Sequence, residues 1–243
     1  MQNTAPQVTF LPDTAVFDLP SAFTTIQQAR AAVDNEEFYQ KMEKVYTRRV
    51  DNKLLGYADQ GFRVMSTNKN VKSINDFKGQ KIRTMENSYH LKFWKTLGAN
   101  PTPMTFSEVY IGLQQGTIDA QENPYEVIVS SKLYEQQDYV VETNHLPHYI
   151  SLIVSDEFYN SLSKDQQKII DQASQTAKVY AREASDKRIA DRIKIIEDSG
   201  TKIVKLDTKT QKEMRKQAQP VYDAIKKSIS KDIYNAYLSG VEK

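Results

Sequence analysis

Two arginines stand in short apolar segments where a guanidinium could bind a carboxylate. Arg63 follows Gly-Phe and Arg83 follows Lys-Ile, and neither lies in a charged run like that at residues 48–49. An arginine at the end of a strand presents a planar fork of donors that can hold a carboxylate through two hydrogen bonds. Taken alone, each arginine is more often a surface residue or an ion-pair partner. The pattern therefore predicts a candidate anion site.

Asn123 is a third candidate because of its place between two predicted elements. It follows a predicted strand and precedes Pro124, which can begin a helix. Ligand sites in open α/β sheets lie at such strand ends. The alternative is that Asn123 caps the helix, a position that asparagine fills well.

Two histidines near an acidic residue raise the possibility of a metal site. His145 and His148 stand close to Glu142. Histidines three residues apart around a proline in an extended segment do not have the spacing of a known zinc site. Surface or packing histidines are the favoured interpretation, and we predict no metal and no cofactor.

Familiar catalytic patterns are missing from the sequence. It contains no G-x-S-x-G elbow, no G-x-x-x-x-G-K-[ST] loop, no G-x-G-x-x-G turn and no H-E-x-x-H helix. It also has no cysteine, which excludes a disulfide, a thiolate metal site and a cysteine nucleophile. An enzyme is therefore disfavoured.

Composition points to a globular protein without a dedicated polyanion-binding surface. The 243 residues are 39% hydrophobic and 26% charged, and 33 Lys and Arg nearly balance 31 Asp and Glu. This balance favours neither nucleic acid nor an anionic membrane as a partner. No apolar run approaches the ~20 residues of a membrane helix, and the first residues do not have the pattern of a signal peptide.

Hydrophobic periodicity predicts helices and strands in alternation. Residues 8–20 read as a loop with a strand stub at 15–17, residues 21–34 and 36–49 as helices, and residues 54–68 as a strand. Further helical segments are expected at 73–77, 88–97, 107–115 and 124–131, and strands at 81–84, 100–104, 117–121, 139–142 and 149–154. Such alternation favours an α/β fold around a mostly parallel sheet.

One predicted helix is exceptionally long. It begins with a Ser-x-x-Gln capping box at residues 163–166, and apolar residues recur at 169, 173, 177, 180 and 184 before Gly200 stops it. A helix far longer than the globular mean of ~11 residues needs a structural reason, and a strut between two lobes is favoured. A short strand at 203–206 and amphipathic helices at 208–238, broken at Pro220, complete the chain.

Five blocks of the sequence, in order and with short gaps, carry a resemblance. They are GFR at 61–63, DFKGQKIR at 76–83, GANPTPMTFSEVY at 98–110, LQQGTIDAQENP at 113–124 and LYE at 133–135. They resemble the substrate-binding receptors of TRAP transporters (tripartite ATP-independent periplasmic transporters), in the group of the dicarboxylate and sialic-acid receptors. Weaker similarity reaches from about residue 10 to the C-terminus, so the resemblance covers nearly the whole chain.

The resemblance implies an α/β protein of the two-lobed periplasmic binding-protein type, class II, with the long helix spanning both lobes. Such a protein closes on a small organic acid and delivers it to the membrane permease subunits. Lobe I would comprise residues 1–60 and 149–188, and lobe II residues 61–148 and 189–243. A periplasmic or extracellular location and a monomeric state are implied for the complete protein.

The resemblance also assigns ligand-binding residues, one by one. Arg83 matches the arginine that makes the main salt bridge to the ligand carboxylate, and Arg63 matches a second arginine of the cleft. Asn123 matches an asparagine that hydrogen-bonds the same end of the ligand, and Phe106 matches an aromatic wall of the pocket. His148 and Tyr149 fall on the segment that crosses back between the lobes and are the weaker choices for specificity.

Some positions depart from the family pattern. Ala120 replaces a usual glycine, and Thr84-Met85 replace a common Val-Pro. Members begin with a signal peptide and very roughly sixty or more residues before the position of Met1. We therefore expect a truncated chain with an incomplete first lobe, exposed apolar surface and a tendency to low stability or self-association.

The leading hypothesis is thus a solute receptor for a small organic acid. The alternative is a ligand sensor or an enzyme on the same lobes, which would need an appended signalling segment or converging catalytic groups. The open ligand classes are a C4-dicarboxylate, a sugar acid, a sialic acid and an aromatic or keto acid.

Overall fold

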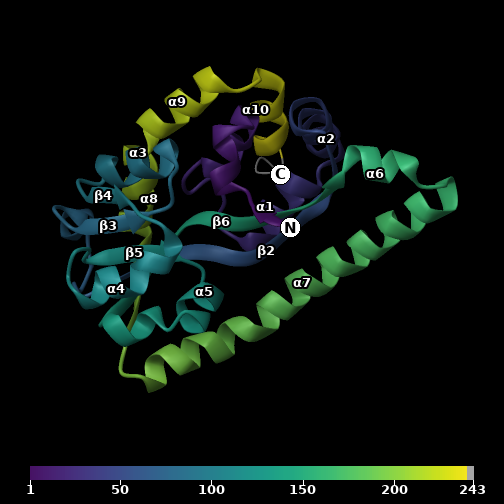
Figure 1. The fold of residues 1–243 in the computed structure, drawn as a ribbon. Coiled ribbons are helices and arrows are strands. Elements are labelled where there is room, and N and C mark those ends of the chain that lie inside the picture. Colours follow the sequence, from purple (N-terminus) through teal and green to yellow (C-terminus); the bar gives the residue numbers. More distant parts are fainter. Residues whose placement is uncertain (240–243) are drawn as a thin grey trace.

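The computed structural model describes residues 1–239, whose strands form one seven-stranded sheet with helices around it (Figure 1). The strand order is β1-β6-β2-β5-β3-β4, and β7 pairs with β6. The strands are β1 Gln2–Asn3, β2 Asn52–Thr67, β3 Lys81–Thr84, β4 Asn100–Pro103, β5 Ala120–Asn123, β6 Tyr139–Ser155 and β7 Lys202–Lys205. The mixed α/β class expected from the sequence is confirmed.

Helices precede, follow and separate these strands. The α-helices are α1 Ile26–Asp34, α2 Glu36–Val50, α3 Ser88–Thr96, α4 Val109–Gln114, α5 Tyr125–Ser130, α6 Asp156–Ser161, α7 Lys164–Asp198, α8 Thr208–Gln217, α9 Gln219–Ser228 and α10 Lys231–Leu238. Short 3₁₀ helices are η1 Ala5–Thr9, η2 Pro12–Asp18, η3 Ile74–Phe77, η4 Phe106–Glu108 and η5 Leu133–Gln136.

The sheet is mixed, so the expectation of a mostly parallel sheet is wrong. β3 runs parallel to β4 and β5, and β6 runs parallel to β7, but β2 is antiparallel to both β5 and β6. The two strands expected at 139–142 and 149–154 are a single strand of 17 residues. It continues through Pro147, which pairs with Phe62 beside a register shift of β2. Such a bulge lets a long strand bend without ending.

The expected strand stub at 15–17 is also wrong, because these residues belong to η2. Pro12 stands in its first turn, where the fixed φ of proline suits a helix and its missing N–H is not needed. Phe17 is buried and packs edge-on against Tyr57, Tyr149 and Tyr237. The apolar segment thus fills the core from a helical turn.

Helix starts follow from capping side chains. Thr25 forms a capping box with Gln28, so α1 begins at Ile26 and not at the expected Ser21. Asn35 accepts a hydrogen bond from the Phe38 N–H and begins α2. The two helices bury their apolar faces against the core.

The long helix α7 is confirmed, with 35 residues and a capping box at Ser163. It runs along one side of the molecule from α6 to β7 (Figure 1). The apolar residues that marked its periodicity are largely exposed, however: Ile169 is 62% exposed and Tyr180 73%. Polar groups attach the buried side, where Arg182 donates to the Tyr57 carbonyl oxygen at 2.6 Å.

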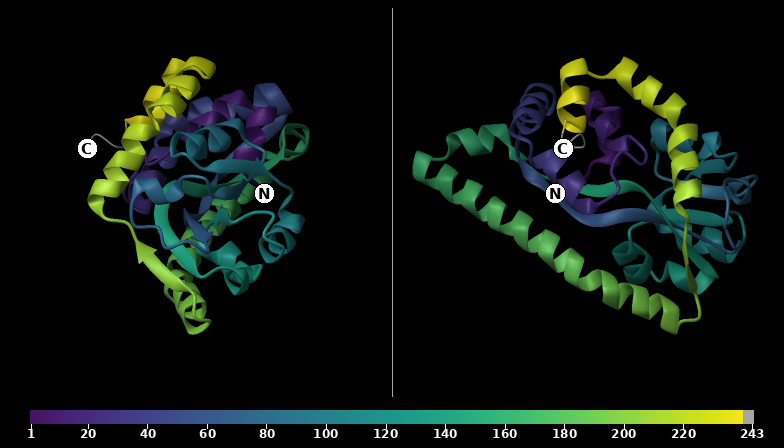
Figure 2. Two further views of the ribbon diagram at one scale, coloured as in Figure 1. Left: turned by 90° about the vertical axis from the view of Figure 1, so that its left-hand side faces the viewer. Right: turned by 180° about the vertical axis from the view of Figure 1, so that it is seen from behind.

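The last three helices cross the molecule on the far side of the sheet from α7. α8 contacts η3, α9 contacts α3 and α10 contacts α2, and the right-hand view of Figure 2 shows the three helices in an arc opposite α7. Pro220 lies in the first turn of α9, which confirms a break near this proline. α10 packs against α1 and α2, so residues 231–238 adjoin the part formed by residues 1–60. The division into two lobes stays a prediction.

Two apolar clusters form the core. The larger lies between the sheet and the first and last helices, and the smaller joins Val64 and Val140 to α4, α5 and Ile196 of α7. Within residues 1–239, none of the helices is both long and apolar enough to cross a membrane.

Candidate ligand-binding site

A buried ion pair between Arg63 and Glu122 forms the centre of the site. Arg63 Nε lies 2.5 Å from Glu122 Oε2, and Nη2 lies 2.9 Å from Oε1. Nη2 also donates to the Glu122 carbonyl oxygen at 2.6 Å. Both side chains are almost fully buried, so Arg63 already has its counter-ion within the protein.

The backbone around Gly61 brings Arg63 to this position. Gly61 has a φ of +78°, a conformation that glycine adopts without strain, and its N–H donates to Asp59 Oδ1. The register of β2 against β6 shifts between Asp59 and Phe62. A bulge of this kind changes the direction of the side chains that follow.

Glu122 is held as a carboxylate. Burial raises its pKa, but the Arg63 guanidinium, the hydrogen bond from His145 and the nearby His90, 3.7 Å away, outweigh burial and hold the pKa well below the usual value. His145 Nε2 lies 3.0 Å from Glu122 Oε2, and His145 Nδ1 lies 2.9 Å from Thr143 Oγ1. Burial lowers the pKa of His145 more than Glu122 raises it, so this histidine is held neutral.

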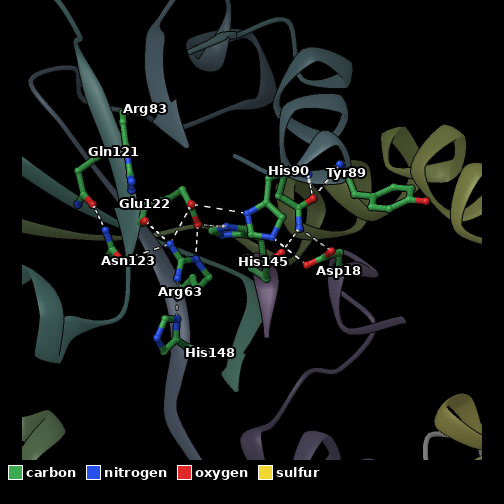
Figure 3. A network of polar contacts seen from close by, with 12 residues as sticks. Asp18, Arg63, Arg83, Tyr89, His90, Gln121, Glu122, Asn123, His145 and His148 are labelled. Carbon is green, nitrogen blue, oxygen red and sulfur yellow. Dashed lines mark hydrogen bonds and ion pairs between the residues drawn. The ribbon is translucent and has the colours of Figure 1, made fainter. Parts of the chain in front are cut away.

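A second branch of the network reaches η2 and α3 (Figure 3). His90 Nε2 lies 2.9 Å from Asp18 Oδ1, and Asn87 Nδ2 donates to Asp18 Oδ2 at 2.7 Å. Burial lowers the pKa of His90, but the Asp18 carboxylate prevails and raises it to about 9. The branch therefore links residues from β5, α3 and η2 through buried charge.

Arg83, by contrast, forms no salt bridge with an acidic side chain among residues 1–239. It is 3% exposed, and its Nε and Nη2 both donate to the Met104 carbonyl oxygen, at 2.9 and 2.7 Å. Its Nη1 is buried without a hydrogen-bond partner among residues 1–239. Burial is the main reason that the pKa of Arg83 is lowered to about 10. This guanidinium has donor capacity left for an anion.

Asn123 contacts Arg63 and also Gln121, which lies next to Arg83 in the sheet. It lies inside β5, which spans 120–123 and not the expected 117–121, and Pro124 begins the next helix in its place. The N-cap alternative for Asn123 is therefore wrong. Its Oδ1 accepts from Arg63 Nη2 at 3.2 Å, and its Nδ2 donates to Gln121 Oε1 at 2.7 Å. Gln121 is in turn the register partner of Arg83.

Two further predicted residues lie beside the arginines. Phe106 is 45% exposed, and its ring centre lies 5.7 Å from Arg83 Cζ, within cation–π range. His148 is buried, and its Nδ1 lies 2.6 Å from Arg63 Nη1. Burial and the neighbouring Arg63 charge hold the pKa of His148 well below its usual value.

Tyr149 is not brought to this group. It is fully buried in the larger apolar cluster, and its hydroxyl donates to the Ala29 carbonyl oxygen at 2.6 Å. Consecutive residues of a strand point to opposite faces, which separates Tyr149 from His148.

The histidines and Glu142 do not converge. Glu142 accepts a hydrogen bond from the Tyr125 hydroxyl at 3.0 Å, and His145 pairs with Glu122. No group of three or more metal-ligating side chains occurs in the part of the chain that the structure describes.

The sequence interpretation gave no role to Glu122, His90 or Asp18, which turn out to organise the site. One signal was available: Glu122 is an acidic residue between Gln and Asn in a short predicted strand, which is unusual unless the strand serves a polar site. The pairing of Asp18 with His90 joins residues 72 positions apart, and no local pattern indicates it.

A mixed α/β scaffold thus holds a network of buried charged side chains, beside which the buried Arg83 forms no salt bridge among residues 1–239. The sequence matches the family described as "Bacterial extracellular solute-binding protein, family 7" over residues 2–228. The chain belongs to this family, as the resemblance to TRAP receptors predicted. The family and its structural neighbours are solute-binding proteins and not enzymes.

Individual relatives are also named as binding proteins. The chain is 38% identical over 182 residues to a solute-binding protein of Verminephrobacter eiseniae, covering 73% of this chain and 53% of the relative. It is 32% identical over 173 residues to the sialic acid-binding periplasmic protein SiaP of Vibrio cholerae, covering 71% of this chain and 53% of that protein. The chain thus spans about half the length of these curated relatives.

Solved structures show the same fold. A TRAP periplasmic solute-binding protein from Polaromonas sp. JS666 bound to D-erythronate superimposes with a TM-score of 0.89 and 32% sequence identity. The match covers 98% of this chain and 78% of that one.

Proposed function

We propose that the protein is an extracytoplasmic receptor that binds a small organic acid and delivers it to a TRAP-type transporter in the membrane. The observation that carries this proposal is the state of Arg83. Its guanidinium is buried, charged and without an acidic partner in the described chain, and its Nη1 has no acceptor. A buried cation without a counter-ion is costly, and a ligand carboxylate would remove that cost.

The two arginines take different roles in this proposal. Arg83 binds the carboxylate directly, because its free donor can complete a charge-assisted hydrogen bond. Arg63 is neutralised by Glu122 and acts mainly by placing Asn123, whose Oδ1 it holds. Phe106 covers the Arg83 guanidinium and would shield the ion pair from water.

The chemistry of the relatives supports an acid as the ligand. Sialic acid and D-erythronate, named for two of the proteins above, both carry a carboxylate. We propose a monocarboxylate or a sugar acid as the ligand class. The proposal places the protein in the periplasm or on the outer face of the membrane, with the permease subunits as partners.

A thermal-shift screen tests ligand binding. The panel comprises C4-dicarboxylates, sugar acids, sialic acids and keto acids, each tested on the unmodified chain, on Arg83→Ala and on Arg83→Lys. A ligand present at 100 times its dissociation constant should stabilise the chain by about 2.7 kcal/mol. Arg49→Ala is the matched control, because Arg49 lies on the exposed face of α2.

The variants decide the role of Arg83. We expect Arg83→Ala to lose about 2–5 kcal/mol of ligand binding, because the ligand charge is then buried without a partner. Arg83→Lys should also bind poorly, since a point charge does not replace the fork. Unchanged affinity of Arg83→Ala, measured by calorimetry with the acid found in the screen, would refute the clamp.

Delivery needs a separate test. Purified permease subunits in detergent should retain the ligand-loaded chain, and the loaded chain should support uptake of that acid into vesicles. Capture of a sensor kinase, with no capture of permease, would favour the sensor alternative.

A further inference from the structure

A small pocket lies between three segments that are distant in the sequence, and it is separate from Arg83. One wall is the segment before α1, another is the bend of β6, and the third is α8. We call it the α8 pocket. Its volume is about 250 Å³, and the residues that matter here are Ser21, Phe23, Thr143, Asn144, Lys212 and Arg215.

The charges of the α8 pocket are all positive. Lys212 and Arg215 line it, and no acidic side chain does so among residues 1–239. Neither residue forms a salt bridge in the described part of the chain. The Arg215 guanidinium lies 3.5 Å from the centre of the Tyr222 ring, and this stacking fixes its position. A fixed guanidinium without a counter-ion is suited to a carboxylate or a phosphate.

The rest of the lining is apolar or hydroxyl-bearing. Phe23 is 4% exposed and packs edge-on against Tyr237, so its ring is a rigid floor. Thr143 is buried beside it. A pocket with an apolar floor, a few polar groups and a charge at one end is typical of a small-molecule site. Its size is below the roughly 300 Å³ at which most ligand pockets begin, which indicates a compact ligand.

Two of the four non-glycine residues with positive φ among residues 1–239 line the same pocket. Ser21 and Asn144 have φ values of +52° and +43°, which non-glycine residues rarely adopt, and both line the pocket. The Ser21 N–H donates to the His145 carbonyl oxygen at 2.7 Å and ties the two strained corners together. Strained residues persist where the surrounding structure holds them in place, and they cluster at ligand sites.

From these observations we infer that the α8 pocket binds a small organic anion with a compact apolar body. The anionic group pairs with Arg215 and Lys212, and the apolar body lies on Phe23. This site goes beyond the proposed function and does not depend on it: Thr143 contacts His145 of the Glu122 network, but Arg83 is not among the lining residues.

The test titrates the ¹⁵N-labelled chain with three probes that share a phenyl ring and follows the amide signals by NMR. Benzoate and phenyl phosphate carry the two candidate anionic groups, and benzamide is the neutral control. We expect saturable amide shifts at Ser21, Thr143 and Asn144 with benzoate or phenyl phosphate, at a dissociation constant of about 1 mM. The stronger of the two anions identifies the preferred group, and benzamide should bind at least roughly tenfold more weakly.

Variants separate this site from the first. Arg215→Gln should weaken binding roughly tenfold, whereas Lys216→Gln, an exposed neighbour on the same helix, should leave it unchanged. Gln211 also lines the pocket, and Gln211→Trp should block it without removing a charge, which guards against a folding defect in Arg215→Gln. Arg83→Ala should abolish binding of the transported acid and leave the α8 pocket shifts intact.

Three results would overturn the inference. The first is that benzamide binds as tightly as the anions, and the second is that Arg215→Gln binds them with unchanged affinity. The third is that no probe shifts the amide signals of Ser21, Thr143 or Asn144. Failure of the organic-acid screen with a positive result here would refute the proposed function alone.

Discussion

Arg63 and Glu122 form a two-point ion pair in the interior, with Nε to Oε2 at 2.5 Å and Nη2 to Oε1 at 2.9 Å. This pair neutralises Arg63, whereas the neighbouring buried Arg83 forms no salt bridge among residues 1–239. The two arginines therefore differ in their surroundings: Arg63 has a carboxylate partner, whereas Arg83 Nη1 has no hydrogen-bond partner in the described chain.

Removing the Glu122 charge should destabilise the protein strongly. In Glu122→Gln the Arg63 guanidinium stays buried without a counter-ion, and we expect the free energy of unfolding to fall by about 3–5 kcal/mol. Urea denaturation measures this. Glu126→Gln is the matched control, because Glu126 and Arg192 pair near the surface and contribute less than about 1 kcal/mol. Equal losses in both variants would contradict the central role of the pair.

Replacing Arg83 should abolish ligand-induced stabilisation without destabilising the ligand-free chain. Arg83→Met removes a buried charge that has no acidic partner, so the ligand-free chain should unfold at an equal or higher temperature than the unmodified chain. The ligand-induced rise in the melting temperature should disappear. Calorimetric scans with and without ligand measure both effects. A large loss of stability without ligand would show that Arg83 is mainly structural.

Between pH 5 and 9.5, the free energy of unfolding should be highest near pH 6.5. The pKa of His90 is raised to about 9 from an unfolded value of ~6.5, so its contribution is complete below pH 6.5 and is lost as the pH rises to 9. The loss amounts to about 3 kcal/mol at most. The pKa values of His145 and His148 are lowered, so stability also falls as the pH drops below 6.5. Urea midpoints measured from pH 5 to 9.5 test this.

The variant His90→Asn tests whether His90 causes the fall in stability above pH 6.5. His90→Asn should flatten the fall in stability between pH 6.5 and 9 and keep the fall on the acid side. An unchanged alkaline slope would mean that another group titrates there.

The bulge at Gly61 should tolerate few substitutions. With φ at +78°, alanine should cost about 1–2 kcal/mol, valine more, and asparagine less. The added Cβ would meet Ile189 Cδ1 at 3.5 Å, which is ordinary contact, so the cost arises from the backbone. Thermal denaturation of the three variants tests this order. Equal stability for alanine and valine would argue against backbone strain.

Local patterns in the sequence were enough for the elements with clear boundaries. The strand at 81–84 and the helix of 35 residues follow from alternation, a capping box and a stopping glycine, all of which act within a few residues. The type of protein also followed from the sequence, because five blocks in order are far more specific than any one of them.

The relative direction of neighbouring strands and the buried side of a helix could not be predicted from local patterns. A strand pattern is the same whether its neighbour is parallel or antiparallel, so β2 and β6 revealed their pairing only in the structure. Helical spacing shows that one side of α7 differs from the other, but not which side the rest of the chain covers. Tyr180 is exposed, while Arg182 is buried against the backbone of β2.

The sequence by itself determined which residue types were available: two arginines in strands, an asparagine beside them and an aromatic residue nearby. Only the tertiary structure decided that Glu122 neutralises Arg63, while Arg83 forms no salt bridge in the described part of the chain. The physical reason is that burial and charge pairing depend on contacts across 59 residues of chain, which no local spacing encodes.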